Sequence, residues 1–320
     1  MANTKIEWTD KVWNIVTGCE KVSAGCKNCY AETYAKRFWG ERKFTDVQCH
    51  EDKLELPLHW KKPQKIFVNS MSDLFHPDVP FEFIDSVFRI MVNSRQHIFQ
   101  ILTKRPERML EFCRCKYFPT SDDDKEYRDK YFSHIWLGVS CEDQKTANKR
   151  IPLLLQAPSA VRFVSLEPLL GEIDLSKWNH KNACGCLDRF DVANCPHCNN
   201  TGVVKELDWV IVGGESGKNA RPMHPDWARS LRNQCKIAGV PFFFKQWGEY
   251  LPADHWGKDD IYNATGGIFL LKDGATRKFN FDSWNQVHED KNIIMPFGRV
   301  GKKAGRLLDE VEYNEFPKGE

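Results

Sequence analysis

The sequence lacks both a long hydrophobic run and a strong excess of charge of one sign. No apolar stretch among its 320 residues approaches the roughly 20 residues that a transmembrane helix needs. The first residues, MANTK, do not begin an apolar signal segment. The 46 basic and 44 acidic residues leave a net charge of +2, so any binding to nucleic acid needs a local basic patch. These absences predict a cytoplasmic protein without a membrane partner.

Cysteine, in contrast, is abundant for a reducing compartment. The chain has 12 cysteines, and clustered cysteines in a cytoplasmic protein favour metal binding over disulfides. Two clusters stand out, and the first comprises Cys19, Cys26 and Cys29 while the second comprises Cys184, Cys186, Cys195 and Cys198. The others are expected to be free thiols: Cys49, Cys113, Cys115, Cys141 and Cys235.

The first cluster has the spacing C-x6-C-x2-C and lies between an apolar run at 12–16 and a predicted helix at 30–39. Three thiolates can hold three irons of a [4Fe–4S] cluster and leave the fourth iron open. Structural zinc usually takes four ligands, and no fourth Cys or His lies within this loop. A disulfide would leave one thiol over. The spacing alone is compatible with three interpretations: an iron–sulfur cluster, a zinc site and three cysteines without a ligand.

A three-cysteine loop after the first strand of a partial barrel resembles the radical S-adenosylmethionine (SAM) enzymes, although their commonest spacing has a shorter first gap. The fuller resemblance, over nearly the whole chain, is to a phage-associated family of unassigned substrate. The segments that carry it are Thr17–Cys19, Leu102–Pro106, Val212–Gly217, Phe244–Gly248 and Gly301–Asp309.

Short apolar runs separated by helix-length spacers predict parallel βα units. Seven strands are expected, at 12–16, 65–69, 97–103, 134–140, 161–166, 208–213 and 240–245. Helices are expected at 81–92, after Pro106, at 143–155 and at 225–238. A closed eight-stranded barrel or a doubly wound sheet would fit this pattern. The resemblance favours a partial, open (β/α)6-type barrel at 1–248, with extra strands at its rim.

Polar residues follow six of these strands, and in parallel α/β folds ligands bind at this carboxyl edge. Singly, each could be a helix cap or a solvated loop residue, but together they predict a site. They are Asn69, Ser70 and Asp73; Thr103, Lys104 and Arg105; Ser140 and Glu142; Ser165 and Glu167; Glu215 and Ser216; and Lys245 and Gln246.

The resemblance implies a [4Fe–4S] cluster on Cys19, Cys26 and Cys29 that binds and reductively cleaves SAM, with an electron donor of the flavodoxin or ferredoxin type. It places the SAM amine near Ser70 and Asp73. The ribose or carboxylate would lie near Ser140 and Glu142, with Glu167 as a further acid of the SAM site. Catalytic candidates are Lys104, which could pair with a carboxylate or phosphate, Glu215 and Lys245.

The second cluster, C-x-C-x8-C-x2-C, lies in a polar insert at 176–206. Four thiols within fifteen residues predict a zinc site that would fold the insert. An auxiliary iron–sulfur cluster is the alternative, since some radical SAM enzymes carry one.

Residues 249–320 are expected to form a C-terminal extension, with a hairpin around Asp273-Gly274. The basic run at 299–306 could hold a nucleic acid or could be a solvated face. We therefore expect a radical SAM enzyme, with a nucleic acid or nucleotide as the first substrate class to consider. The alternatives are a zinc-binding, nucleic-acid-binding protein without catalysis and a radical SAM enzyme acting on a peptide or small molecule.

Overall fold

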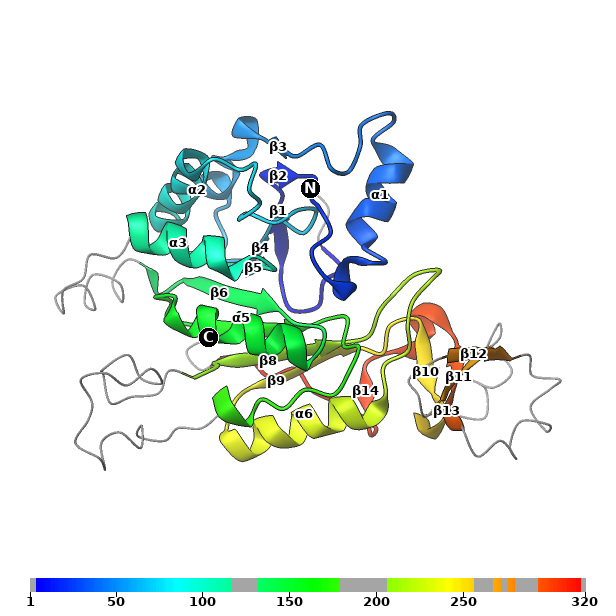
Figure 1. Cartoon of the computed structure of the whole chain (residues 1–320). Helices are drawn as coiled ribbons and strands as arrows, with labels where there is room; N and C mark the ends of the chain where they lie inside the picture. The colour runs from blue at the N-terminus through cyan, green and yellow to red at the C-terminus, as the bar shows by residue number, and fades with distance from the viewer. Residues whose placement is uncertain are drawn as a thin grey trace, which may run out of the picture.

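A curled sheet of seven parallel strands dominates the fold (Figure 1). The computed structural model describes residues 4–116, 132–178, 206–255, 267–271, 276–279 and 293–317. The sheet runs in the order β1-β4-β5-β6-β7-β8-β9. Its strands are β1 (Lys11–Trp13), β4 (Lys65–Val68), β5 (Ile98–Thr103), β6 (Ile135–Ser140), β7 (Arg162–Leu166), β8 (Trp209–Gly213) and β9 (Phe242–Gln246). Each strand lies beside its predecessor in this series, so the sheet winds in one direction and forms a half-barrel.

The helices lie close to their predicted positions, because their ends carry strong local signals. They are α1 (Tyr30–Phe38), α2 (Phe81–Asn93), α3 (Pro106–Lys116), α5 (Gln144–Gln156) and α6 (Pro225–Ala238). The Asp143 side chain caps α5 by accepting a hydrogen bond from the Thr146 backbone N–H at 2.8 Å. Helix α6 begins at a proline and is followed by the cap residue Gly239, whose φ of 68° is left-handed.

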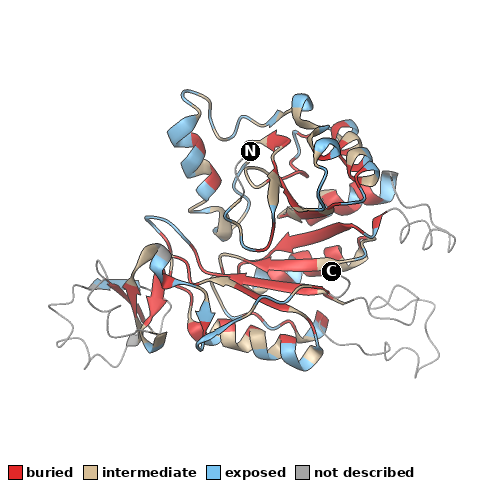
Figure 2. Cartoon of the chain, turned by 180° about the vertical axis from the view of Figure 1, so that it is seen from behind, coloured by how far each residue is buried: buried red, intermediate tan, exposed pale blue. Residues whose placement is uncertain are grey.

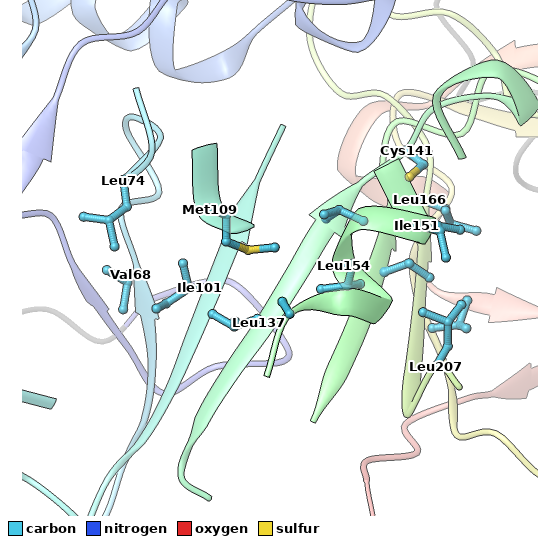
Figure 3. Close-up of a cluster of buried hydrophobic side chains, with 14 of the residues drawn as sticks. Val68, Leu74, Ile101, Met109, Leu137, Cys141, Ile151, Leu154, Leu166 and Leu207 are labelled. Carbon is cyan, nitrogen blue, oxygen red and sulfur yellow. The ribbon is translucent and has the colours of Figure 1, made fainter. Parts of the chain in front are cut away.

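The outer face of the half-barrel is covered by α2, α3, α5 and α6, all of which contribute to one large apolar core. Figure 3 shows part of this layer, where Met109 of α3 and Ile151 and Leu154 of α5 lie against strand residues such as Ile101 and Leu137. Alternate strand residues face this core, as a pleated strand requires. Figure 2 shows the strands as the most buried part of the chain.

The opposite, concave face is filled with aromatic rings from successive strands. Its cluster comprises Trp8, Phe67, Trp136, Phe163, Trp209, Ile211 and Phe243. Gly138 of β6 lies beneath the Phe163 ring, and a Cβ there would stand 2.5 Å from a ring carbon. The half-barrel is therefore a packed core at this level, and ligands can approach only nearer its carboxyl edge.

The expected partial parallel barrel is confirmed, but its expected composition is not. All seven predicted strands join one sheet, so the sheet is not a six-stranded barrel with additional strands at its rim. The consecutive strand order excludes the doubly wound alternative. Over the described residues β1 and β9 do not pair with each other, so the closed barrel is not formed either.

The first predicted strand is split in two. After β1 the chain leaves the sheet, and β2 (Val16–Thr17) pairs instead with β3 (Gln48–Cys49). The Asn69 side chain accepts hydrogen bonds from the backbone N–H groups of Ile15 and Val16 at 3.0 and 2.9 Å, which holds the bend.

The C-terminal part forms a second, antiparallel sheet in the order β10-β13-β11-β12. Its strands are β10 (Tyr250–Pro252), β11 (Gly267–Leu271), β12 (Thr276–Phe279) and β13 (Ile293–Arg299), and a short pair follows, β14 (Leu307–Leu308) and β15 (Val311–Glu312). The pairing of β11 with β12 confirms the two arms of the predicted hairpin, whose turn lies outside the described residues.

The end of the described chain returns to the half-barrel. Phe316 packs on the rings of Trp209 and Phe243, with centroids 5.0 and 5.6 Å apart. The predicted boundary at 248/249 thus marks a change of sheet, while residues near 316 belong to the first core. In the described part of the chain, no helix has the length and apolar character needed to cross a membrane.

Candidate functional site

The three-cysteine loop lies at the carboxyl edge of the parallel sheet. It follows β2, contains the short 3-10 turn Ala24–Cys26, and leads into α1. Cys19, Cys26 and Cys29 are free thiols of intermediate exposure. Among the residues that the structure describes, no three His, Cys, Asp or Glu side chains are gathered closely enough to hold a metal ion as they stand. A metal centre on this loop therefore requires the thiols to turn toward one another.

Arg105, after β5, ties the start of the loop to the sheet. Its guanidinium lies 3.6 Å from the Cys19 sulfur and donates to the Glu20 carbonyl at 3.3 Å. Burial raises the pKa of the Cys19 thiol and the Asp73 charge raises it further, while Arg105 acts in the opposite direction. A cation thus lies beside the Cys19 sulfur, which must be a thiolate to bind a metal.

Asp73, a predicted ligand of the SAM amine, is buried and already fully hydrogen-bonded. It accepts from Thr103 Oγ1 at 2.7 Å, the Lys104 backbone N–H at 3.0 Å and Arg105 Nη1 at 3.1 Å. These contacts join the ends of β4 and β5. Ser70 lies on the same connection, and its backbone carbonyl accepts a hydrogen bond from the Tyr30 hydroxyl at the start of α1.

Glu142, after β6, supports the middle of the loop. Its Oε1 accepts from the Gly25 backbone N–H at 3.0 Å, and its Oε2 pairs with Arg150 of α5 at 3.0 Å. Both side chains are almost completely buried. Arg150 also donates to the carbonyl of Ser140 at 2.7 Å. Glu142 therefore contacts the loop backbone, where the resemblance implied a contact with ribose or carboxylate.

Glu215, after β8, supports the loop from the other half of the sheet. It accepts from Asn28 Nδ2 at 3.0 Å and pairs with Arg221, which also donates to the Ala24 carbonyl at 3.0 Å. Burial acts to raise the pKa of Glu215, but the hydrogen bonds from Arg221 and Asn28 outweigh it and hold the pKa below its usual value. Glu215 is thus an ionised anchor of the loop.

Glu167 and Lys245 form an ion pair across the ends of β7 and β9. Lys245 Nζ lies 2.7 and 2.9 Å from the two Glu167 oxygens. The intervening strand carries Gly213 at this level, and a Cβ there would stand 3.2 Å from Glu167 Cδ. A side chain at this position would therefore crowd Glu167. Glu167 and Lys245 alternate in register with Phe163 and Phe243, so they share the concave face.

The predicted residues thus meet at one edge but divide into two groups. Asp73, Glu142 and Glu215 hold the cysteine loop, while Glu167 and Lys245 pair with each other. The side chain of Lys104 makes no hydrogen bond or ion pair with the rest of the described chain.

Three residues that complete this edge have no distinctive signal in the sequence: Asn28, Arg150 and Arg221. Asn28 stands between two cysteines, and Arg221 follows the glycine-rich turn after β8, but neither position has a spacing that identifies its partner. Arg150 lies in the middle of α5, where arginine is usually solvent-exposed.

The second cysteine cluster, Cys184, Cys186, Cys195 and Cys198, lies outside the described residues. The basic run near the C-terminus is partly engaged within the protein. Arg299 pairs with Glu249 at 3.0 Å, and Arg306 lies over the Phe243 ring and donates to Asn314. These contacts leave less free charge for nucleic acid than the sequence suggested.

Comparison with known proteins shows the family. No curated protein and no solved structure matches the chain. One family model matches residues 3–317, which is nearly the whole sequence. The chain therefore belongs to the family described as "Protein of unknown function (DUF5131)".

Proposed function

We propose that this protein is a radical SAM enzyme, in which Cys19, Cys26 and Cys29 hold a [4Fe–4S] cluster with one open iron. The observation that carries the proposal is the position of the loop. Three free thiols lie at the carboxyl edge of a partial parallel barrel, between contacts from both halves of the sheet. This edge is where parallel α/β folds bind their ligands.

The chemistry of the donors fits such a group. Thiolates are the usual ligands of iron–sulfur clusters, and three are too few for a closed structural zinc site. The three thiols are neither in disulfides nor completely buried. The Arg105 guanidinium supplies a positive charge beside Cys19. When bound, the cluster supplies the electron that breaks a carbon–sulfur bond of SAM.

The residues of the chain would bind and orient the ligand and exclude water from it. Ser140, Ser165, Glu167 and Lys245 share the concave face at the carboxyl ends of their strands, where they offer acceptors and a cation to a polar ligand. The aromatic layer beneath them closes the half-barrel to water. An electron donor of the flavodoxin or ferredoxin type completes the proposal.

The test is the metal content and SAM chemistry of protein purified without oxygen. Wild-type protein should contain iron and sulfide, and dithionite with SAM should release 5′-deoxyadenosine. Cys26→Ala and Cys29→Ala should lose both properties. Cys49→Ala is the matched control, since Cys49 is also a free thiol of intermediate exposure but lies on β3 outside the loop.

Two results would contradict the proposal. Full iron content and SAM cleavage in the Cys26→Ala protein would show that the loop does not hold the cluster. Zinc in place of iron at this loop, with no response to SAM, would favour a zinc-binding protein without catalysis. Zinc that remains bound in the Cys26→Ala variant would be assigned to the insert, and it does not affect this test.

A further inference from the structure

We propose that Glu215 and Arg221 are positioning residues that close a latch on the three-cysteine loop from the far side of the half-barrel. Glu215 engages the side chain of Asn28, and Arg221 engages the backbone carbonyl of Ala24. The role of the latch in holding a cluster rests on the function proposed above. The role of the latch in fixing the loop is independent of that function.

The latch consists of three hydrogen bonds to the loop, which end on Ala24 and Asn28, and of the Glu215–Arg221 pair that supports them. Glu215 Oε2 accepts from Asn28 Nδ2 at 3.0 Å and from Arg221 Nε at 2.8 Å. Arg221 Nη2 donates to the Ala24 carbonyl at 3.0 Å. Asn28 Nδ2 also donates to the backbone carbonyl of Asn219 at 2.7 Å. Both ends of the segment that contains Cys26 are thus fixed to the connection between β8 and α6.

The position of the latch in the sheet makes these contacts long-range. The loop follows β1 and β2, whereas Glu215 follows β8, and β4, β5, β6 and β7 lie between β1 and β8 in the sheet. Only the curl of the sheet brings the two together. Arg105 holds the loop at Cys19, on the β5 side, and Glu142 holds Gly25 from β6. Without the latch the end that carries Cys26 and Cys29 would lack its anchor at β8.

The electrostatics of the latch make it strong. The Glu215 side chain is only 5% exposed, and its charge is compensated by Arg221 and by the Asn28 amide. Hydrogen bonds to an ionised, poorly solvated carboxylate are about twice as strong as neutral ones. Asn28 lies between Cys26 and Cys29, so fixing its side chain restricts the backbone that carries both thiols. A cluster held at only three corners depends on that restriction.

The experiment measures alkylation of individual cysteines in reduced, unloaded full-length protein, using iodoacetamide and peptide mass spectrometry. Asn28→Ala is the main variant, because it removes two of the three hydrogen bonds between the latch and the loop and leaves the Glu215–Arg221 pair intact. The rates at Cys26 and Cys29 should rise about tenfold, as expected when charge-assisted hydrogen bonds no longer oppose local opening. The rate at buried Cys113 should not change, which separates local opening from unfolding.

Further variants test the other half of the latch. Arg221→Met should act like Asn28→Ala, and Arg221→Lys should give intermediate rates, because a lysine has one nitrogen for two separated acceptors. Arg229→Met is the control, since the Arg229 side chain is 27% exposed against 28% for Arg221 and pairs with Asp254 and Asp309, which lie outside the loop and the latch. Unchanged rates at Cys26 and Cys29 in both Asn28→Ala and Arg221→Met, or an equal rise at Cys113, would overturn the inference.

The loaded protein gives a second readout. Iron should leave the Asn28→Ala protein about tenfold faster in the presence of a chelator, and the electron paramagnetic resonance signal of the reduced cluster should broaden. If wild-type protein binds no iron, the proposed function fails while the alkylation rates still decide the latch. If iron is bound and its release is unchanged, the latch does not position the cluster.

Discussion

Replacing Arg105 by methionine should destabilise the protein strongly, because the change leaves the Asp73 carboxylate buried without its cation. The two side chains are 11% and 7% exposed, and Arg105 Nη1 lies 3.1 Å from Asp73 Oδ2. Asp73 also accepts from Thr103 Oγ1 and from backbone N–H groups, so the carboxylate keeps part of its compensation.

The magnitude follows from the burial of the pair. Removing one partner of a buried ion pair costs about 3–5 kcal/mol, and the donors that remain on Asp73 place Arg105→Met near the lower end, at about 3 kcal/mol. Asp73→Asn should also destabilise, because its NH2 group would face the Lys104 N–H and the guanidinium, which are both donors. In the double variant position 73 carries no charge and the guanidinium is absent, so its loss of stability should be smaller than the sum of the two single losses. We expect this difference, the coupling energy between Asp73 and Arg105, to be about 2 kcal/mol.

The assay is a double-mutant cycle from urea unfolding, followed by tryptophan fluorescence under reducing conditions. The control cycle uses Asp85 and Arg89, a surface pair on α2 at 2.9 Å in which the arginine is 75% exposed. That pair should couple by about 0.5 kcal/mol or less. A coupling between Asp73 and Arg105 no larger than that of the control would refute the reasoning that burial makes this pair strong.

Three further predictions concern the core. Gly138→Val should lower stability by about 3 kcal/mol or prevent folding, because its side chain would enter the Phe163 ring, as thermal unfolding will show. Phe316→Ala should cost about 2–3 kcal/mol by the same measurement, since the ring packs on Trp209. Burial lowers the pKa of His134, so the unfolded chain binds its proton first and stability should fall as the pH drops below about 6.5. His134→Gln should make that decline shallower in urea unfolding from pH 7.5 to 5.5, and an unchanged slope would contradict it.

Local patterns in the sequence were sufficient for the individual elements. The apolar runs that became β4 to β9 and the helix signals at Pro106, Asp143 and Gly239 act over a few residues, so their positions follow from short-range chemistry. The same patterns placed Asp73, Glu142, Glu167, Glu215 and Lys245 at one edge, because parallel strands share their carboxyl side.

Tertiary structure alone decided what these side chains contact. The curl of the sheet brings the end of β8 to a loop that follows β2, and no periodicity in the sequence encodes that distance. Asn28 became a partner of Glu215 only through this curl, and the same curl brought Arg221 to the Ala24 carbonyl. Likewise, Gly213 could be read as a flexible turn, but in the structure a side chain there would crowd Glu167, which pairs with Lys245. Elements follow from neighbours in sequence, whereas hydrogen-bond partners follow from packing between segments that are distant in the chain.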